Sequence, residues 1–377
     1  MTFGRIAIVG LVLTGTWLLA HLYVGSRLLQ PGMWPQAVDC AAWSLLALSW
    51  VLTPLAFTAR FFLSKRRAKL LQVAGFTGMG LFAVLIVLVV VVDLVLVCAG
   101  LFGLHWETRW LWSGLLGVWA VLCAAGLRGA KYLPRTMEHE VVIQGLPPGL
   151  VGFRIAQVSD LHVGESISRE RVEEVVAGVN ALEPDLVAIT GDLVDGSLEE
   201  LSADVAPLAG LRARHGIFFV TGNHEYYSGA EAWCRHLSSL GMRVLQNEHV
   251  VLQHEGGLVA VAGVPDPAVR MLGTGDAPSL AKALAGVPES AFRLLLAHQP
   301  RIARESAGLG VQLQLSGHTH GGQFFPFTLL VGLFQPYVAG LYRVREMWLH
   351  VSRGTGHWGP PMRLASPQEI SLLKLVV

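Results

Sequence analysis

Four long apolar runs fill the first third of this 377-residue chain and restrict its fold more than any other feature. They cover approximately residues 6–28, 37–62, 74–101 and 111–129. A helix needs ~20 apolar residues to cross a bilayer, and each run supplies about that many. A buried core helix could explain one run. Four in succession, with almost no charge, favour an all-α transmembrane domain of about four helices over residues 1–130.

The positions of Lys and Arg predict how this domain is oriented. Basic residues gather between the second and third runs and after the fourth, at Lys65, Arg66, Arg67 and Lys69 and at Arg128, Lys131 and Arg135. The positive-inside rule then places both termini on the cytoplasmic face of the cell (inner) membrane. The third run contains Asp93, which we expect to face other helices or water. A re-entrant or double crossing there would put the second half of the chain outside.

From about residue 131 onward the composition is that of an ordinary globular enzyme. The net charge of +1 and the lack of a basic stripe predict no nucleic-acid partner. Three of the four cysteines lie in the apolar runs, and Cys234 stands alone in the second half. This distribution favours a reducing compartment and predicts neither a disulfide framework nor a thiolate metal site.

The second half alternates between strand-like and helix-like segments. Residues 131–150 have the character of a polar connector, and 151–377 form the globular domain. Strands are predicted at 153–158, 186–190, 217–220, 291–297, 311–315, 347–352 and 370–376, with hairpins between 245 and 263 and helices at 166–182 and 198–211. This order predicts an α/β sandwich of sheets covered by helices.

Oxygen and nitrogen donors follow five of these strands. They are Asp160, His162, Asp192, Asn223, His298, His318 and His320. Ligands in such folds bind at the carboxyl ends of strands, and residues two apart in extended backbone point the same way. Seven donors are too many for one ion and suit two ions that share a carboxylate. Imidazole and oxygen donors without thiolate suit Mn, Fe, Zn or Co.

In chain order, these donors lie in motifs that resemble those of the calcineurin-like metallophosphoesterases. The motifs are Asp160-x-His162, Gly191-Asp192-x-x-Asp195, Gly222-Asn223-His224-Glu225, the strand end at His298, and Gly317-His318-x-His320. The run Gly-His-Thr-His-Gly-Gly-Gln is similar to the bacterial subgroup that has membrane-anchored members. The resemblance extends from about residue 153 to the C-terminus and implies a four-layer α-β-β-α sandwich.

The resemblance also implies a role for each residue. Asp160, His162 and His320 would hold one divalent ion, Asn223, His298 and His318 the other, and Asp192 would bridge them. His224 would act on the leaving-group oxygen as general acid or charge stabiliser, and Asp195 would orient its imidazole. Five further residues are either substrate contacts or ordinary packing residues: Tyr226, Tyr337, Tyr342, His357 and Arg363.

Together these observations predict a membrane-anchored two-metal hydrolase of phosphate esters that uses a metal-bridging hydroxide. The bond would be a phosphodiester or a pyrophosphate, in a phosphorylated small molecule or a lipid-linked or nucleotide-linked substrate. Two alternatives stay open. One is a non-catalytic membrane receptor or transporter with a ligand-binding domain. The other, within the enzyme class, is a pyrophosphatase of the UDP-2,3-diacylglucosamine type.

Overall fold

The computed structural model describes residues 3–104, 106–164, 166–272 and 275–377. The chain divides into two compact units. The helical unit comprises residues 1–128 together with 359–362, and the globular unit comprises 129–358 together with 363–377.

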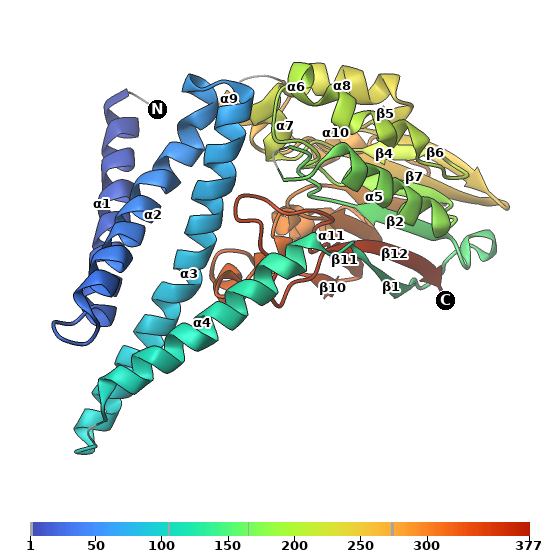
Figure 1. Ribbon diagram of the computed structural model, residues 1–377. Helices are drawn as coiled ribbons and strands as arrows, with labels where there is room; N and C mark the ends of the chain where they lie inside the picture. Colours follow the sequence, from blue (N-terminus) through green and yellow to red (C-terminus); the bar gives the residue numbers. More distant parts are fainter. Residues whose placement is uncertain (1–2, 105, 165, 273–274) are drawn as a thin grey trace. The chain divides into compact units, whose positions relative to one another are not determined.

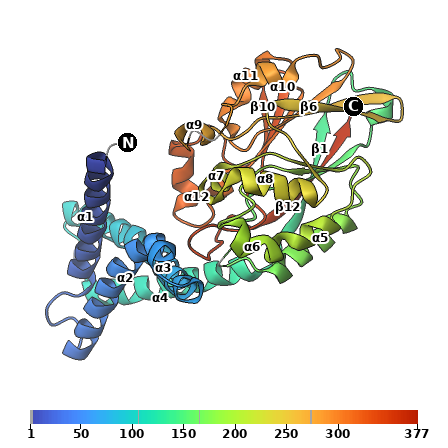
Figure 2. The same cartoon turned by 90° about the horizontal axis from the view of Figure 1, so that it is seen from above.

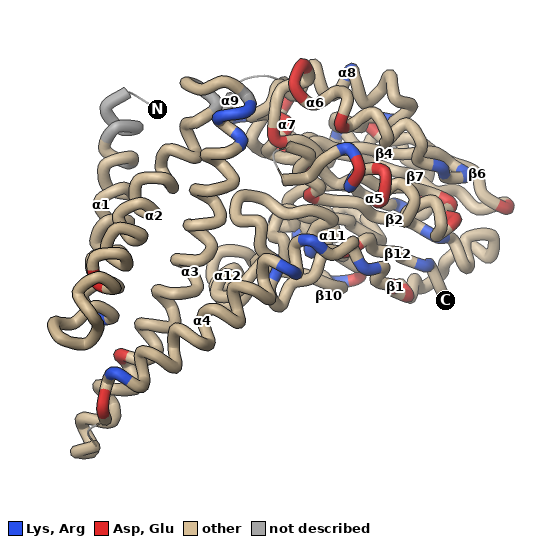
Figure 3. The backbone as a smooth tube through the Cα atoms, viewed as in Figure 1, with Lys and Arg blue, Asp and Glu red and all other residues tan. Residues whose placement is uncertain are grey.

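Four long helices form the helical unit, and charged residues are sparse along them (Figures 1 and 3). They are α1 (Phe3–Leu28), α2 (Gln36–Phe62), α3 (Lys65–Leu101) and α4 (Thr108–Lys131). Among the described residues, segments of α2, α3 and α4 are long and apolar enough to cross a membrane. The expected four-helix region is therefore present, and three of its helices qualify as candidate spans. That α1 also crosses stays a prediction, because the side chains of several of its first residues lie outside the described set.

The Asp93 segment is one continuous helix. Helix α3 runs unbroken over 37 residues, so the described backbone has no re-entrant turn at this point. The Asp93 carboxylate accepts hydrogen bonds from Tyr23 Oη at 2.6 Å and from Arg27 Nε at 2.9 Å, both on α1. As expected for an ionisable group within a span, Asp93 faces another helix and is paired there.

The globular unit contains two six-stranded mixed sheets (Figures 1 and 2). The first has the order β1 (Arg135–Val142), β12 (Glu369–Val376), β2 (Arg154–Val158), β3 (Leu186–Ile189), β4 (Ile217–Phe219) and β5 (Met242–Val244). The second has the order β10 (Gly340–Val344), β11 (Met347–Val351), β9 (Leu313–Ser316), β8 (Phe292–Leu296), β7 (Gly257–Gly263) and β6 (Glu248–His254). Strands β2 to β5 run parallel, as do β7 to β9.

Helices cover the outer faces of both sheets. Three lie on the first sheet, α5 (Arg169–Ala181), α6 (Leu198–Val205) and α8 (Ala230–Ser239), and two on the second, α10 (Leu280–Leu284) and α11 (Ala303–Gly308). Along β2 the side chains alternate, because Ile155 packs between the sheets while Ala156 and Val158 pack under the helices. The predicted four-layer sandwich is confirmed. Shorter pieces complete the unit: η1 (Pro148–Leu150), η2 (Ala206–Gly210), α7 (Asn223–Ser228), α9 (Val269–Leu272), η3 (Pro300–Ile302), η4 (His320–Gly322), α12 (Phe327–Leu330) and η5 (Val331–Leu333).

Two expected segments differ in detail. Residues 131–150, expected to be a connector, contain strand β1, which pairs in parallel with β12 over eight residues. Its polar residues face solvent on an edge strand while Val141 is fully buried, so its sequence carries only a weak strand pattern. The helix expected at 198–211 ends at Val205 and continues as η2, where Pro207 cannot donate a helical hydrogen bond.

Candidate metal centre

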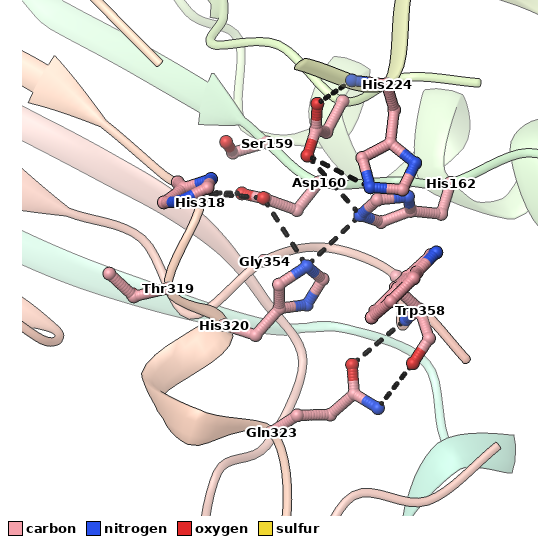
Figure 4. A network of polar contacts seen from close by, with 12 residues as sticks. Ser159, Asp160, His162, His224, His318, Thr319, His320, Gln323, Gly354 and Trp358 are labelled. Atoms are coloured by element: carbon pink, nitrogen blue, oxygen red, sulfur yellow. Dashed lines mark hydrogen bonds and ion pairs between the residues drawn. The ribbon is translucent and has the colours of Figure 1, made fainter. Parts of the chain in front are cut away.

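The predicted donors follow β2, β3 and β4 of the first sheet and β8 and β9 of the second. The loops after these strands can approach one another closely, because the residues at the closest contacts are glycines without a side chain. A Cβ added at Gly317 would overlap the Asp160 carboxylate, and one at Gly222 would overlap Asp192. The structure thus brings all seven predicted donors, with His224 and Asp195, into one region at the strand ends. Figure 4 shows five of these residues, Asp160, His162, His224, His318 and His320.

One group of donors consists of Asp160, His162 and His320, whose ligand atoms all lie within 4.8 Å of one another. His162 Nε2 and His320 Nε2 are 3.1 Å apart, and His320 Nε2 is 3.5 Å from Asp160 Oδ1. All three converge on one point in Figure 4. This is the set that the sequence assigned to the first ion.

A second group consists of Asp192, His298 and His318, again within 4.8 Å. His298 Nε2 lies 3.1 Å from Asp192 Oδ2 and 3.2 Å from His318 Nδ1. Asn223 Oδ1 is 3.1 Å from His318 Nδ1, so the amide joins this group. Asp192 Oδ2 is also 3.9 Å from His162 Nε2. Asp192 therefore lies between the two groups, as a bridging carboxylate would.

The spacing of these donors fits divalent cations. Two donors bound at right angles to one ion at ~2.0–2.2 Å are separated by about 3 Å, close to the separations in both groups. Burial, together with the charge of His298, lowers the pKa of His318 to about 3, and burial with His162 lowers the pKa of His320 well below its usual value. Both imidazoles are therefore neutral at neutral pH, and their lone pairs are available to a metal.

Asp195 and His224 form a separate pair beside the donors. Asp195 Oδ1 lies 2.6 Å from His224 Nδ1 and 2.9 Å from His162 Nδ1, so it orients both rings, whereas the sequence suggested only the first contact. Burial would lower the pKa of His224, but Asp192 and Asp195 together raise it to about 9. Both carboxylates therefore favour the protonated form of the His224 imidazole. Its Nε2 is 3.9 Å from Asp192 Oδ2.

Several donors sit in strained backbone. Asp160, His162, Asp192, His318 and His320 all have φ between 52° and 73°, the left-handed region that residues other than glycine rarely adopt. Such conformations cost about 1–3 kcal/mol each and persist where the surrounding structure imposes them. Five of the seven donors share this feature, which marks the site independently of any sequence motif.

Glu225 belongs to the Gly222-Asn223-His224-Glu225 motif, but the sequence reasoning gave it no role. Its buried carboxylate accepts the backbone N–H groups of Asp192 at 3.0 Å, Leu193 at 2.7 Å, Val194 at 3.3 Å and Gly222 at 2.6 Å. Burial and the charge of Asp192 raise the pKa of Glu225 to about 7. Glu225 holds the loop after β3 against the start of α7. Its place in that motif, two positions after the donor Asn223, is the sequence feature that points to Glu225.

The additional substrate-contact candidates are mostly structural. Arg363 is buried and donates to the backbone carbonyls of His320, Arg353 and Gly356. Tyr342 Oη accepts two backbone N–H groups and its ring packs on Tyr337. Tyr226 is buried with its hydroxyl beside Thr221, and His357 is also buried. Two other aromatic side chains, Tyr227 and Trp358, contact the His224 ring at centroid distances of 5.4 and 5.5 Å.

Comparisons with known proteins agree with this geometry. The sequence profile of the calcineurin-like phosphoesterases matches residues 153–322. An uncharacterized metallophosphoesterase from Aquifex aeolicus is 34% identical over 258 residues, which cover 68% of this chain and 97% of that protein. The chain therefore belongs to the calcineurin-like metallophosphoesterases, a family of metal-dependent phosphoesterases.

A second relative is named as a transmembrane protein. The transmembrane protein with metallophosphoesterase domain from Danio rerio is 39% identical over 264 residues, covering 68% of this chain. The match spans 60% of that relative's length. Among solved structures, the calcineurin-like phosphoesterase YfkN from Bacillus subtilis aligns with 57% of this chain and 89% of its own, at 15% identity and a TM-score of 0.39.

Proposed function

We propose that this protein is a membrane-anchored phosphoesterase that binds two divalent metal ions. The observation that carries the proposal is the pair of donor groups joined by Asp192, whose Oδ2 lies 3.1 Å from His298 and 3.9 Å from His162. Family membership and the candidate spans of α2, α3 and α4 support it. In this proposal residues 1–130 are the anchor, and 151–377, extended by β1, form the catalytic domain.

In this proposal the metal ligands are those predicted from the sequence. Asp160, His162 and His320 hold one ion, Asn223, His298 and His318 hold the other, and Asp192 contacts both. The ions, when bound, supply positive charge to a phosphate ester and a water of lowered pKa as nucleophile. Mn, Fe, Zn and Co all suit this mixture of nitrogen and oxygen donors.

His224 would supply the proton that the leaving group needs. Asp195 fixes its Nδ1, which leaves Nε2 on the side of the donor cluster. Asp192 and Asp195 raise the pKa of His224 and so favour the protonated imidazole that a general acid requires. The complete donor set and this acid favour an enzyme over the receptor or transporter alternative, because ligand binding alone needs no proton donor.

The substrate class follows from the anchor. A catalytic domain held at a membrane meets membrane-confined molecules more often than dissolved ones. We therefore favour a phosphodiester or pyrophosphate bond in a lipid-linked substrate over one in a dissolved phosphorylated small molecule. A nucleotide-linked lipid of the UDP-2,3-diacylglucosamine type is one member of that class.

The basic residues place the catalytic domain on the cytoplasmic face of the cell (inner) membrane in this proposal. Four of them lie at the start of α3, at positions 65, 66, 67 and 69, and others surround the end of α4. Reporter fusions after Val377 and near Pro35 test the orientation. The first should be read as cytoplasmic and the second as external, and an external C-terminus would reverse the assignment.

The central experiment separates metal ligands from the acid. The full-length protein, purified in detergent and loaded with manganese, should hydrolyse methyl nitrophenyl phosphate. Asp192→Asn should lose bound metal together with activity. His224→Ala should retain both ions and lose ~10²–10⁴-fold in rate on esters with poor leaving groups. The loss should be smaller for nitrophenol, which departs without a proton.

Three results would contradict this scheme. A folded, metal-loaded protein that hydrolyses no phosphate ester would favour the receptor. Metal loss in His224→Ala would make His224 a ligand, a role that its position near His162 and Asp192 permits. Equal losses on good and poor leaving groups would exclude His224 as the acid.

A further inference from the structure

An apolar segment protrudes from the globular unit directly after the last metal-ligand loop. It comprises residues 327–334, which form α12 and η5. Leu329, Leu333 and Phe334 are 71%, 75% and 73% exposed, and Phe327 and Leu330 are also exposed. No Asp, Glu, Lys, Arg or His occurs between residues 321 and 342. Soluble surfaces rarely gather so many large apolar side chains, and such patches mark contacts with proteins or membranes.

The segment is held rigidly to the metal centre. At its start, the backbone of Phe327 and Thr328 packs against Gly322. A Cβ added to this glycine would lie only 2.5 Å from Thr328 Cα. Beyond its end, Thr319 Oγ1, in the loop between His318 and His320, donates to the Val338 carbonyl. Phe324 and Pro326 are buried beneath it. The exposed side chains therefore point outward from a fixed base.

Two further contacts link the segment to His224, the proposed acid. Gln323, immediately before the segment, bonds through its side chain to the backbone N and O of Trp358, both at 2.9 Å (Figure 4). The Trp358 ring in turn contacts His224. Trp358 and Tyr227, the two aromatic residues beside the acid, are themselves 41% and 58% exposed. Exposed aromatic rings of this kind favour the membrane–water interface.

A cation lies at the base of the segment. Arg301, in η3 after the His298 strand, donates to the Phe334 carbonyl at 3.1 Å and to Gln335 Oε1 at 3.3 Å. Arg301 itself is an exposed residue. Apolar residues with a flanking basic residue are the combination that binds an anionic lipid surface.

From this arrangement we propose that residues 327–334 insert into the lipid surface and present the metal centre to phosphate esters carried by membrane lipids. A lipid surface is favoured over a protein partner because α4, a candidate span, ends at Lys131 and β1 begins at Arg135. The three intervening residues keep the globular unit beside the bilayer. Contact with lipid can be tested alone, whereas the substrate class rests on the proposed function.

Photo-crosslinking of the full chain in nanodiscs of phosphatidylcholine and phosphatidylglycerol tests the contact. Benzoylphenylalanine replaces Leu333 or Phe334, and in a control it replaces Leu309, a 41% exposed residue after α11. Mass spectrometry should find lipid adducts at 333 and 334 and none at 309. Adducts with peptides from residues 1–128, adducts with a second copy, or no adducts at 333 and 334 would each overturn the proposal.

A matched pair of substrates tests the consequence for catalysis. Methyl nitrophenyl phosphate is soluble, and hexadecyl nitrophenyl phosphate is held in the nanodisc, but both have the same leaving group. The double variant Leu333→Ser, Phe334→Ser should keep its melting temperature and its rate on the methyl ester within twofold. Its kcat/KM for the hexadecyl ester should fall at least tenfold. Leu309→Ser with Val251→Ser, two exposed residues elsewhere, should change neither rate.

The outcomes of the two proposals are separable. Wild-type protein that hydrolyses neither ester would refute the proposed function, while the lipid adducts would still decide the contact. Hydrolysis of both esters with no selective loss in the double variant would overturn the presentation of lipid substrates by this segment.

Discussion

A single carboxylate, Asp195, contacts both the proposed acid and a proposed metal ligand. Its Oδ1 reaches His224 Nδ1 and His162 Nδ1. Asp195 therefore affects two processes at once, because it raises the proton affinity of one imidazole and fixes the orientation of the other. A substitution at this position should change acid strength first and metal affinity second.

The pH dependence of turnover tests this dual role. His224 must be protonated to act as an acid, so the rate on a poor leaving group should fall as pH rises through the His224 pKa. That pKa is raised to about 9 by Asp192 and Asp195, and bound cations would move it downward. Asp195→Asn removes one negative charge and should shift the alkaline limb to lower pH. A kcat/KM profile that stays in place, or moves upward, would contradict the pairing.

At the level of single residues, the structure brings together the donors that the sequence predicts, but their backbone geometry could not be predicted. The donors could be found because each follows a strand, and strand ends are visible in the apolar pattern. The left-handed backbone of Asp160 or His318 could not be predicted, because nothing in the residue type requires it. The contact between Asp195 and His162 likewise depends on how two parallel strands place their loops.

At the level of elements, Glu225 connects the loop after β3 to the start of α7. Glu225→Gln should break this connection, because an amide offers one oxygen and brings N–H donors against backbone N–H groups. Each buried donor left without a partner costs about 1–3 kcal/mol. We expect a lower melting temperature and weaker metal binding. The control, Glu231→Gln on the exposed face of α8, should change neither.

The sequence analysis missed strand β1 and the segment around α12, for different reasons. Strand β1 has alternating polar residues and pairs only with β12, so its neighbour lies more than 200 residues away in the chain. The segment around α12 is apolar, but its residues are too few and too interrupted to predict that they face outward. For β1, a partner distant in sequence decides the outcome.

On the scale of the whole molecule, β1 determines where the globular unit begins. A fragment of residues 129–377 should fold, bind metal and show one cooperative transition. A fragment of residues 144–377 lacks β1, so β12 loses an eight-residue ladder and the buried Val141 side chain is missing. Loss of that side chain alone costs about 1.5–3 kcal/mol. Thermal unfolding followed by circular dichroism compares the two, and equal melting temperatures would show that β1 is dispensable.

The position of β12 also has a consequence for biosynthesis. It follows β2 by more than 200 residues, yet it lies between β1 and β2 rather than at an edge of the first sheet. While the ribosome is still translating, β1 has no neighbour in the sheet and one side of β2 is unpaired. Domains usually fold as units while they emerge. This one cannot complete its first sheet until β12 has left the exit tunnel, so a nascent chain that stops before Glu369 would carry two unpaired strand edges.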